Sequence, residues 1–236
     1  MKELKATLIE SIKRTPSVVS FRFALPEKVE FIPGQFLQVI FDQENRDNKD
    51  LNKYLSLSCS PAKGTIEITK RISKSNFSQH LLSLKPNDEV LVKIPLGSCI
   101  FKDEYKRIGF LIGGIGITPV ISIIEYIVDI KLDTELFLFY SNRSEDDIAF
   151  KKELDYWQAI NKNIKIFYTV TEYIPKDKTC LFGHIDKKLL EEKARNLAES
   201  IIYIFGPPKM VEAMTNLAME TDCKKENIRT EKFVGY

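Results

Sequence analysis

The sequence predicts a two-domain protein, in which an N-terminal antiparallel β-barrel or sandwich is followed by an α/β domain built on a parallel sheet. Residues 1 to about 100 contain short segments rich in β-branched and aromatic residues, separated by turn residues. From about residue 107, apolar segments alternate with helical ones. A length of 236 residues allows one large or two small domains, and we expect residues 1–102 to form the first and residues 103–236 the second.

The first domain is expected to contain several strands and one helix. The strand segments are rich in valine, isoleucine, phenylalanine and threonine, and they cover residues 18–25, 36–41, 65–72 and 89–96. A helix is expected near residues 76–84, where Ser75 is placed to cap the N-terminus. Several strands with a single helix are typical of a small antiparallel barrel or sandwich.

The second domain is expected to alternate strand and helix. Its strand segments show little polar alternation, as expected of strands buried on both faces, and they cover residues 108–113, 136–141, 164–170 and 201–206. Helices are expected at residues 118–129, about 145–160, 185–196 and 208–220. This order is typical of a parallel sheet with right-handed crossovers.

A glycine-rich segment, GGIGITP at residues 113–119, follows the first strand of the second domain. Gly113, Gly114 and Gly116 allow the backbone to approach a ligand closely, and Pro119 suits the first turn of a helix that begins near Thr118. Parallel sheets bind ligands at the carboxyl ends of their strands, where free N–H groups and the helix dipole attract a phosphate. A tight turn that binds nothing is the alternative.

The composition excludes several classes of function. A net charge of +2 gives no electrostatic reason to expect nucleic acid or an acidic membrane surface as a partner. No run approaches the ~20 apolar residues of a membrane span, and the N-terminus lacks the apolar core of a signal peptide. We therefore expect a cytoplasmic protein with reduced thiols and no bound metal. The cysteines are isolated, which argues against zinc and iron–sulfur sites: Cys59, Cys99, Cys180 and Cys223.

Five motifs in sequence order carry a family resemblance. They are PGQF (33–36), KYLSLSCSP (53–61), GGIGITP (113–119), FGPPKM (205–210) and EKFVGY (231–236). Together they resemble the ferredoxin–NADP reductase superfamily of flavoproteins, over nearly the whole chain. The resemblance implies a flavin-binding β-barrel followed by a nicotinamide-nucleotide-binding α/β domain.

The resemblance implies a flavin site around residues 53–56. Lys53 stands where the family has an arginine that meets the flavin phosphate, so the charge is kept but the bidentate fork is lost. Leu55 replaces the aromatic residue that packs beside the flavin ring, unless Tyr54 takes that place. Ser56 matches the serine whose hydroxyl contacts flavin N5, and it is a predicted catalytic residue. A polar strand edge that faces solvent is the alternative.

A second flavin element is implied at residues 69–82. Lys70 and Arg71 supply positive charge there. The residues that open the following helix offer N–H groups and hydroxyls to a second phosphate: Ser75, Asn76, Phe77 and Ser78. Two anchoring points suit FAD better than FMN. An ordinary capped helix with basic flanks is the alternative.

In the second domain, the resemblance implies a site for the pyrophosphate of NADH or NADPH. The glycine-rich segment would cradle it, and Thr118 would add a hydroxyl group. Gly206, Pro207 and Pro208 end another parallel strand and therefore lie on the same edge of the sheet. Phe205 stands where the family often has a cysteine beside the nicotinamide, so it is expected either as an apolar wall or as part of the core.

The C-terminal segment completes the implied site. Glu231 and Phe233 resemble an acidic and aromatic pair near the family's C-terminus, and Glu231 is the second predicted catalytic residue. Phe233 or Tyr236 would cover the flavin ring until the nicotinamide displaces it. The alternative is a frayed tail.

The expected hydride donor is NADH rather than NADPH. Thr171 and Glu172 follow the strand that ends near Val170, and a carboxylate there would repel a 2′-phosphate but accept hydrogen bonds from a ribose. Arg143 is the residue that favours NADPH instead.

The sequence therefore predicts a flavoprotein reductase that passes electrons from NADH or NADPH through FAD to a redox protein such as ferredoxin or flavodoxin. One alternative is an electron-transfer flavin subunit of a larger dehydrogenase or oxygenase complex. Another is a nucleotide-binding module without turnover, which the residues at positions 53, 55 and 205 leave open. His80 and His184 are expected on the surface or in caps, without a catalytic role.

Overall fold

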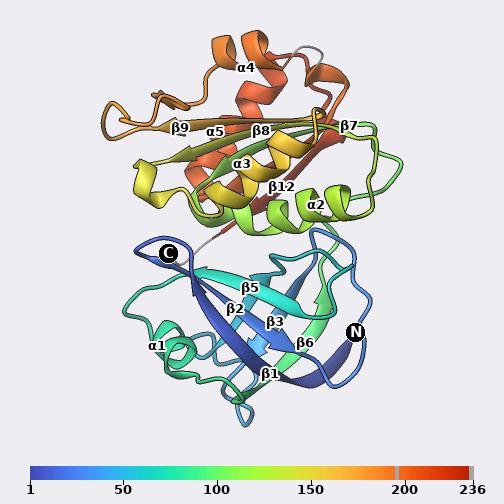
Figure 1. The fold of residues 1–236 in the computed structure, drawn as a ribbon, viewed down its shortest axis with the longest axis vertical. Coiled ribbons are helices and arrows are strands. Elements are labelled where there is room, and N and C mark those ends of the chain that lie inside the picture. The colour runs from blue at the N-terminus through green and yellow to red at the C-terminus, as the bar shows by residue number, and fades with distance from the viewer. Residues whose placement is uncertain (195–196, 234–236) are drawn as a thin grey trace. The chain divides into compact units, whose positions relative to one another are not determined.

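The computed structural model describes residues 1–194 and 197–233, and it divides into two compact units (Figure 1). Unit 1 comprises Met1–Phe101 and Thr118–Ile130, and unit 2 comprises Lys102–Ile117 and Lys131–Tyr236. The domain boundary between residues 102 and 103 stays a prediction.

Unit 1 is built on a nearly closed antiparallel barrel. Its single sheet has the strand order β4-β3-β6-β1-β2-β5, and a bridge between Leu57 and Ile68 joins the two edges. The helix α1 (Asn76–Ser83) lies between β5 and β6 in the chain. The strands are β1 (Lys2–Lys13), β2 (Val18–Ala24), β3 (Phe36–Ile40), β4 (Asn52–Ser56), β5 (Ile66–Arg71) and β6 (Glu89–Leu96). The predicted antiparallel barrel is thereby confirmed.

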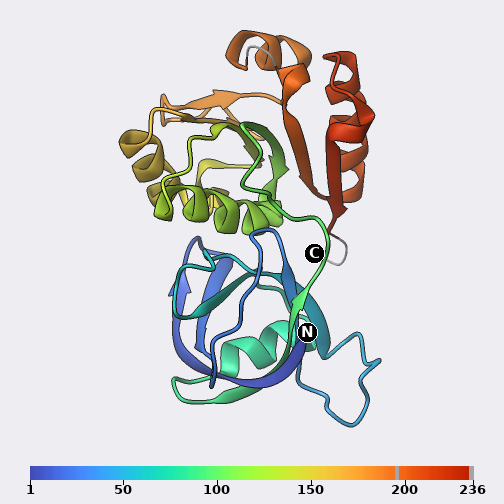
Figure 2. The same ribbon diagram turned by 90° about the vertical axis from the view of Figure 1, so that its right-hand side faces the viewer.

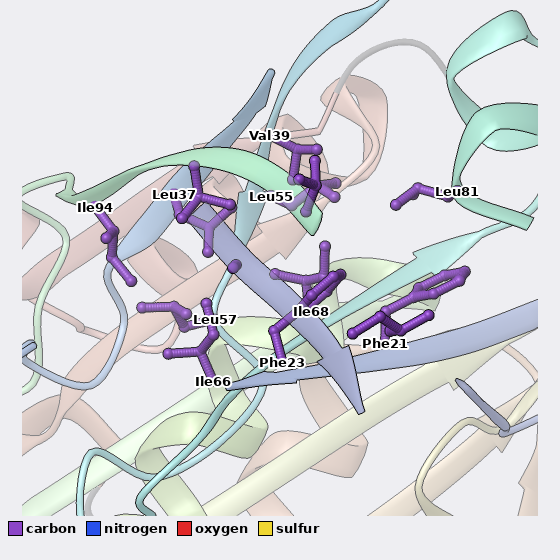
Figure 3. Close-up of a cluster of buried hydrophobic side chains, with 14 of the residues drawn as sticks. Phe21, Phe23, Leu37, Val39, Leu55, Leu57, Ile66, Ile68, Leu81 and Ile94 are labelled. Carbon is purple, nitrogen blue, oxygen red and sulfur yellow. The ribbon is translucent and has the colours of Figure 1, made fainter. Parts of the chain in front are cut away.

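The interior of the barrel is filled by the apolar side chains that alternate along its strands. Successive residues of a strand point to opposite faces, so every second residue enters the core. Figure 3 shows the resulting cluster, in which Leu81 of α1 joins the strand residues. Each large side chain buried in this way stabilises the fold by about 1.5–3 kcal/mol. The labelled strand residues are Phe21, Phe23, Leu37, Val39, Leu55, Ile66, Ile68 and Ile94.

Unit 2 is built on a fully parallel sheet, as predicted. Its order is β10-β9-β8-β7-β11-β12. The chain moves outward in one direction from β7 to β10 and then returns to the other side of β7, so the order reverses between β7 and β11. Ligands of such sheets bind at this switch point. The strands are β7 (Arg107–Gly113), β8 (Glu135–Asn142), β9 (Ile164–Val170), β10 (Cys180–Phe182), β11 (Ile201–Gly206) and β12 (Ile228–Lys232).

Helices cover both faces of the sheet of unit 2. The helix α5 (Pro208–Glu220) and the short α4 (Lys187–Lys193) pack on one face, and α3 (Lys151–Ile160) packs on the other (Figure 2). The helix predicted at about 145–160 is divided, because Phe150 adopts a left-handed φ of 61° between η2 (Glu145–Asp147) and α3. Within the described part of the chain, no helix has the length and hydropathy to cross a membrane.

Four strands were not predicted: β1, β4 and β12 have largely polar sequences, and β10 is apolar but very short. β1 reads KELKATLIESIK and carries many of its charged residues outward, although it lies in the middle of the barrel sheet. β4, β10 and β12 are edge strands, and β10 has only three residues. Such a segment becomes a strand by pairing with its neighbour, and its own side chains do little to predict a strand.

Candidate functional site

The strand β4 carries the residues that are predicted to meet the flavin. Its pairing with β3 places Leu55 opposite Leu37 and Tyr54 opposite Gln38. Leu55 therefore points into the barrel core, while Tyr54 is 63% exposed and its ring contacts Phe36 edge-on at 5.7 Å between centroids (Figure 3). Of the two candidates for the aromatic position, Tyr54 is the one available to a ligand on the outside of the barrel.

Ser56 is the last residue of β4 and is nearly buried, at 7% exposure. Its backbone lies opposite Phe36 of β3. Within the described residues its hydroxyl forms no recorded hydrogen bond, so the group is available to a ligand. Its role beside flavin N5 stays a prediction.

A pair of lysines lies where the two edge strands of the barrel come together. Lys70 of β5 is 7% exposed, and its Nζ lies 5.9 Å from the centroid of the Phe77 ring. Burial lowers the pKa of Lys70, and the positive charge of Lys53 on β4 lowers it further. A phosphate group bound here would offset the repulsion between the two lysines, so the residues present fit an anionic ligand.

The start of α1 offers backbone groups more than side chains. The Ser78 N–H donates to Ser75 Oγ at 3.3 Å, and the buried Ser78 hydroxyl lies 3.1 Å from that same oxygen. Phe77 belongs to the barrel core, and Asn76 donates from Nδ2 to Asp50 at 2.6 Å. Among the described residues, no backbone partner is recorded for the amides of Asn76 and Phe77, which makes them the groups free to bind a second phosphate. Arg71 Nη1 donates to Ser17 at 3.3 Å, beside the same turn.

The glycine-rich segment folds as a 3₁₀ turn, η1 (Gly114–Gly116), followed by the helix α2 (Ile117–Asp129). Gly114 has a φ of 52°, which suits glycine. A Cβ atom on Gly116 would lie 2.4 Å from the Phe205 carbonyl oxygen, and one on Gly113 would lie 2.1 Å from Met210 Sδ. Packing inside unit 2 therefore requires Gly116, where the neighbour is backbone, whether or not a ligand binds, whereas at Gly113 the flexible Met210 side chain can move aside.

The N–H groups nearest the end of β7 are the remaining candidates for a pyrophosphate, because the Ile117 N–H that opens α2 already donates to the Gly114 carbonyl. The helix begins at Ile117, one residue before the predicted start, and Pro119 lies in its first turn. Thr118 is 4% exposed. The first N–H groups of a helix lack partners within it, and the helix dipole adds partial positive charge there. The binding roles of Gly113, Gly114, Gly116, Thr118 and Pro119 stay predictions.

The carboxyl end of β11 lies against η1 and β12. Pro207 is the N-cap of α5 and Pro208 occupies its first position, where a missing N–H costs nothing. Phe205 is fully buried, with its ring centroid 5.7 Å from that of Tyr203, so it belongs to the core of unit 2. Gly206 follows Phe205 at the end of the strand.

The C-terminal segment forms the edge strand β12. Glu231 lies opposite Phe205 in the parallel pair, and the Phe233 N–H donates to the Gly206 carbonyl at 3.0 Å. Burial raises the pKa of Glu231 to about 7. The carboxyl group therefore exchanges its proton near neutral pH. The structure brings Glu231 and Phe233 to the Gly206 turn, whereas Tyr236 lies outside the described residues.

Two charged residues follow the neighbouring strands β8 and β9. The Glu172 N–H donates to the Arg143 carbonyl at 3.0 Å, and Arg143 Nε lies 3.9 Å from Glu172 Oε1. Both side chains are more than half exposed, so the ion pair is weak. The acidic and basic candidates for recognition of the ribose are thus neighbours, and each partly neutralises the other.

One polar residue at this edge was missed by the sequence reasoning. Asn142 ends β8 at 5% exposure, and neither its Oδ1 nor its Nδ2 finds a partner among the described residues. A buried amide without partners is costly, and a polar ligand at the strand ends would supply them. The sequence did offer one indication of this residue, because Asn142 directly precedes Arg143 at the end of a predicted strand.

The histidines and metal-binding side chains offer little chemistry. His80 Nδ1 lies 2.9 Å from the Asn76 carbonyl oxygen inside α1, and His184 lies in the turn before α4. Across residues 1–194 and 197–233, no group of three or more histidine, cysteine or acidic side chains is arranged to hold a metal ion.

Family models match most of the chain. Residues 5–101 match the oxidoreductase FAD-binding domain, and residues 110–216 match the oxidoreductase NAD-binding domain. The fold is similar to that of a ferredoxin NADP⁺ reductase from Neisseria gonorrhoeae with bound FAD and NADP, with a TM-score of 0.80 and 17% identity over 98% of this chain and 99% of that one. The chain belongs to the ferredoxin–NADP reductase superfamily of flavin oxidoreductases. The expected cofactors, FAD and NADH or NADPH, are thereby confirmed.

Several reductases of this superfamily are similar in sequence. An NADH-cytochrome b5 reductase-like protein of Arabidopsis thaliana is 35% identical over 176 residues, which cover 73% of this chain and 53% of that protein. Nitrate reductase [NADH] 1 of Nicotiana tabacum is 29% identical over 247 residues, covering 92% of this chain and 27% of that protein. The chain thus spans about half of the first relative and about a quarter of the second. The cytochrome b5 reductase domain of Ulva prolifera nitrate reductase has a TM-score of 0.81 at 25% identity, over 98% of this chain and 97% of that one.

Proposed function

We propose that this flavin oxidoreductase takes a hydride from NADH and passes electrons through FAD to a redox protein. The observation that carries the proposal is the arrangement at β4, where Tyr54 and the unbonded hydroxyl of Ser56 lie on the same strand as Lys53, whose positive charge lowers the pKa of Lys70 on β5. The relatives named as NADH-dependent reductases support the choice of donor.

FAD supplies a hydride acceptor that can release electrons one at a time. The side chains of the barrel bind and orient it. Lys53 and Lys70 hold one phosphate, and the amides of Asn76 and Phe77 hold the other. Tyr54 would pack beside the ring, and the Ser56 hydroxyl would be the group that donates a hydrogen bond to it.

In unit 2, the amides of η1 would hold the nicotinamide dinucleotide by its pyrophosphate. The carboxylate of Glu172 accepts hydrogen bonds from the ribose, and it disfavours a 2′-phosphate. The side-chain amide of Asn142, which has no partner in the part of the protein that the structure describes, would form hydrogen bonds with the same dinucleotide. Glu231, with a pKa of about 7, takes up or releases a proton close to neutral pH, and Phe233 shields the site from water.

The experiment that tests the proposal is an anaerobic titration of the purified protein. We expect a yellow protein that releases FAD on denaturation, with its absorbance near 450 nm bleached by NADH faster than by NADPH. A colourless protein that takes up no flavin would contradict the proposal and would favour a nucleotide-binding module without turnover. Bleaching by NADPH alone would contradict the role of Glu172.

The acceptor is proposed to be a protein that carries single electrons. Ferredoxin, flavodoxin and a small cytochrome each accept electrons in this way, and the name of the Arabidopsis relative favours the cytochrome. Steady-state reduction of each acceptor by NADH in the presence of the reductase would separate them. Activity with small oxidants alone would contradict a protein acceptor.

A second candidate function is that of a reductase module within a larger electron-transfer assembly. The matched region makes up only 27% of the tobacco nitrate reductase, so similar sequences serve as parts of longer proteins. Co-purification of the chain with a second polypeptide that holds haem or a metal cluster would support this candidate. A single-component preparation that reduces its acceptor unaided would contradict it.

A further inference from the structure

The segment that follows Ser56 is held on two sides. On one side lies the barrel: the Leu57 N–H donates to the Gln35 carbonyl at 3.1 Å, and the Ser58 N–H donates to the Glu67 carbonyl at 2.8 Å. These bonds continue the barrel beyond the end of β4. They fix the backbone of residues 57 and 58, and the Glu67 N–H also donates to Cys59 Sγ at 3.1 Å, so the side chain of residue 59 is held by the barrel as well.

On the other side lies α2, which belongs to unit 1 from Thr118 onward. The Ser122 hydroxyl donates to the Cys59 carbonyl at 2.7 Å. The Ser60 N–H donates to Glu125 Oε2 at 2.7 Å. Ser122 and Glu125 are three residues apart and therefore share one face of the helix, so the helix binds both polar groups of the single peptide link between residues 59 and 60.

Glu125 is an unusual residue for a purely structural helix face. Burial raises the pKa of its carboxyl group, whereas the bond from Ser60 and the charge of Lys63, 3.5 Å away, lower it. An apolar residue at this position would avoid the cost of burying a carboxylate. An apolar side chain could not accept the hydrogen bond from the Ser60 N–H, whereas the Glu125 carboxylate does. The cost of burying this carboxylate is therefore explained if the hydrogen bond is needed to hold residues 59 and 60 in place.

We propose that Ser122 and Glu125 are positioning residues for Ser56, which hold residues 59 and 60 so that the Ser56 hydroxyl stays aligned for hydride transfer. This inference rests on the proposed function. The helix that carries them begins inside the glycine-rich segment, so one continuous element runs from the predicted dinucleotide site to the contact with residues 59 and 60. Small errors in alignment cost much in rate, up to about 10²-fold for about 1 Å.

The test compares Glu125→Ala with Asp129→Ala in the FAD-loaded protein. Asp129 lies one turn further along the same helix and contacts Lys63 at 3.5 Å, so its loss perturbs the helix and the same lysine without releasing residue 60. We expect Glu125→Ala to slow flavin reduction by NADH about tenfold in stopped-flow measurements, with less than a twofold change in the dissociation constant of NADH. Asp129→Ala should stay within twofold of the wild type. Glu125→Gln should recover most of the rate, because the amide oxygen still accepts the Ser60 N–H.

Two further measurements separate positioning from general damage. Hydrogen exchange at the amides of residues 57–63 should quicken in Glu125→Ala and not in Asp129→Ala. In a Ser56→Ala background, Glu125→Ala should slow reduction by less than a further twofold, because its effect passes through the Ser56 hydroxyl.

The outcomes distinguish this inference from the function on which it rests. If NADH does not reduce the flavin of the wild type, the proposed function and the inference both fail. If the wild type is reduced and Glu125→Ala matches it, or if the losses from Ser56→Ala and Glu125→Ala multiply in full, the inference alone is overturned. A change in the NADH dissociation constant that accounts for the whole loss would also overturn it.

Discussion

The substitution Gly116→Ala separates the two explanations of the glycine-rich segment. If glycine serves only to let a ligand approach, alanine should weaken dinucleotide binding and leave the stability of the free protein unchanged. If glycine is required by packing inside unit 2, alanine should destabilise the protein without any ligand. The structure favours the second explanation, because the added Cβ atom would meet the backbone of β11.

The expected loss of stability follows from the distances. The Cβ atom would lie 2.4 Å from the Phe205 carbonyl oxygen and 2.6 Å from its carbon, against 3.4–4 Å for an ordinary contact. β11 is paired on both sides, with β7 and β12, so its backbone cannot yield and η1 must move by about 1 Å. Overpacking of this kind costs about 1–3 kcal/mol, of which the helical preference of alanine returns at most about 1 kcal/mol.

The assay is thermal unfolding of the protein without nicotinamide, followed by circular dichroism. A net loss of about 1–2 kcal/mol lowers the melting temperature of a chain of this size by about 2–8 °C. The control is Gly64→Ala, because nothing lies within 4 Å of a Cβ atom at Gly64. This control should be neutral or slightly stabilising. If the two variants melt within about 1 °C of each other, the packing argument is wrong.

Three other substitutions test the site. Lys53→Ala should weaken FAD binding by roughly tenfold or more, because a charged hydrogen bond to phosphate is worth about 1.5–3 kcal/mol, and flavin fluorescence titration would measure this. Glu172→Arg should raise the ratio of kcat/KM for NADPH to that for NADH by about tenfold in steady-state assays, because the new cation can pair with a 2′-phosphate. Glu231→Gln should change the pH dependence of stability. The folded state keeps a proton on Glu231 up to a pKa of about 7, whereas the unfolded chain releases it near its ordinary value, so the wild type should lose stability relative to Glu231→Gln as pH rises from about 4.5 to 7. Denaturant unfolding at several pH values would show a constant difference if this reasoning is wrong.

The sequence predicted the buried strands and long helices well, because their signals are local. The segments at 108–113 and 201–206 appear as β7 and β11 within one residue at either end, and the helix at 208–220 appears with the predicted bounds. A short apolar run without alternation is typical of a strand buried on both faces, and a proline at the first helical position marks a start. Polar edge strands such as β12 gave no such signal, since only the partner strand defines them.

The candidate site was predicted less completely, because residue types in a motif do not show which way a side chain points. Leu55 and Tyr54 were open alternatives until the pairing of β4 with β3 placed one inside the barrel and the other outside. The hydroxyls at the start of α1 were expected to bind a phosphate, but Ser75 and Ser78 largely satisfy each other. In both places the backbone arrangement decided which groups remained available.

The contacts of α2 show a further reason why a motif underdetermines a site. The glycine-rich segment was interpreted through its own residues, yet the Phe205 backbone explains Gly116 from a distant part of the chain. Ser122 and Glu125 carry no recognisable pattern, since a serine and a glutamate on a helix are ordinary surface residues in most sequences. Their contacts with residues 59 and 60 become visible only when a helix of one sequence region lies against a loop of another. Residues that bind cofactors can therefore be predicted from local patterns, whereas residues that position them depend on contacts between distant segments.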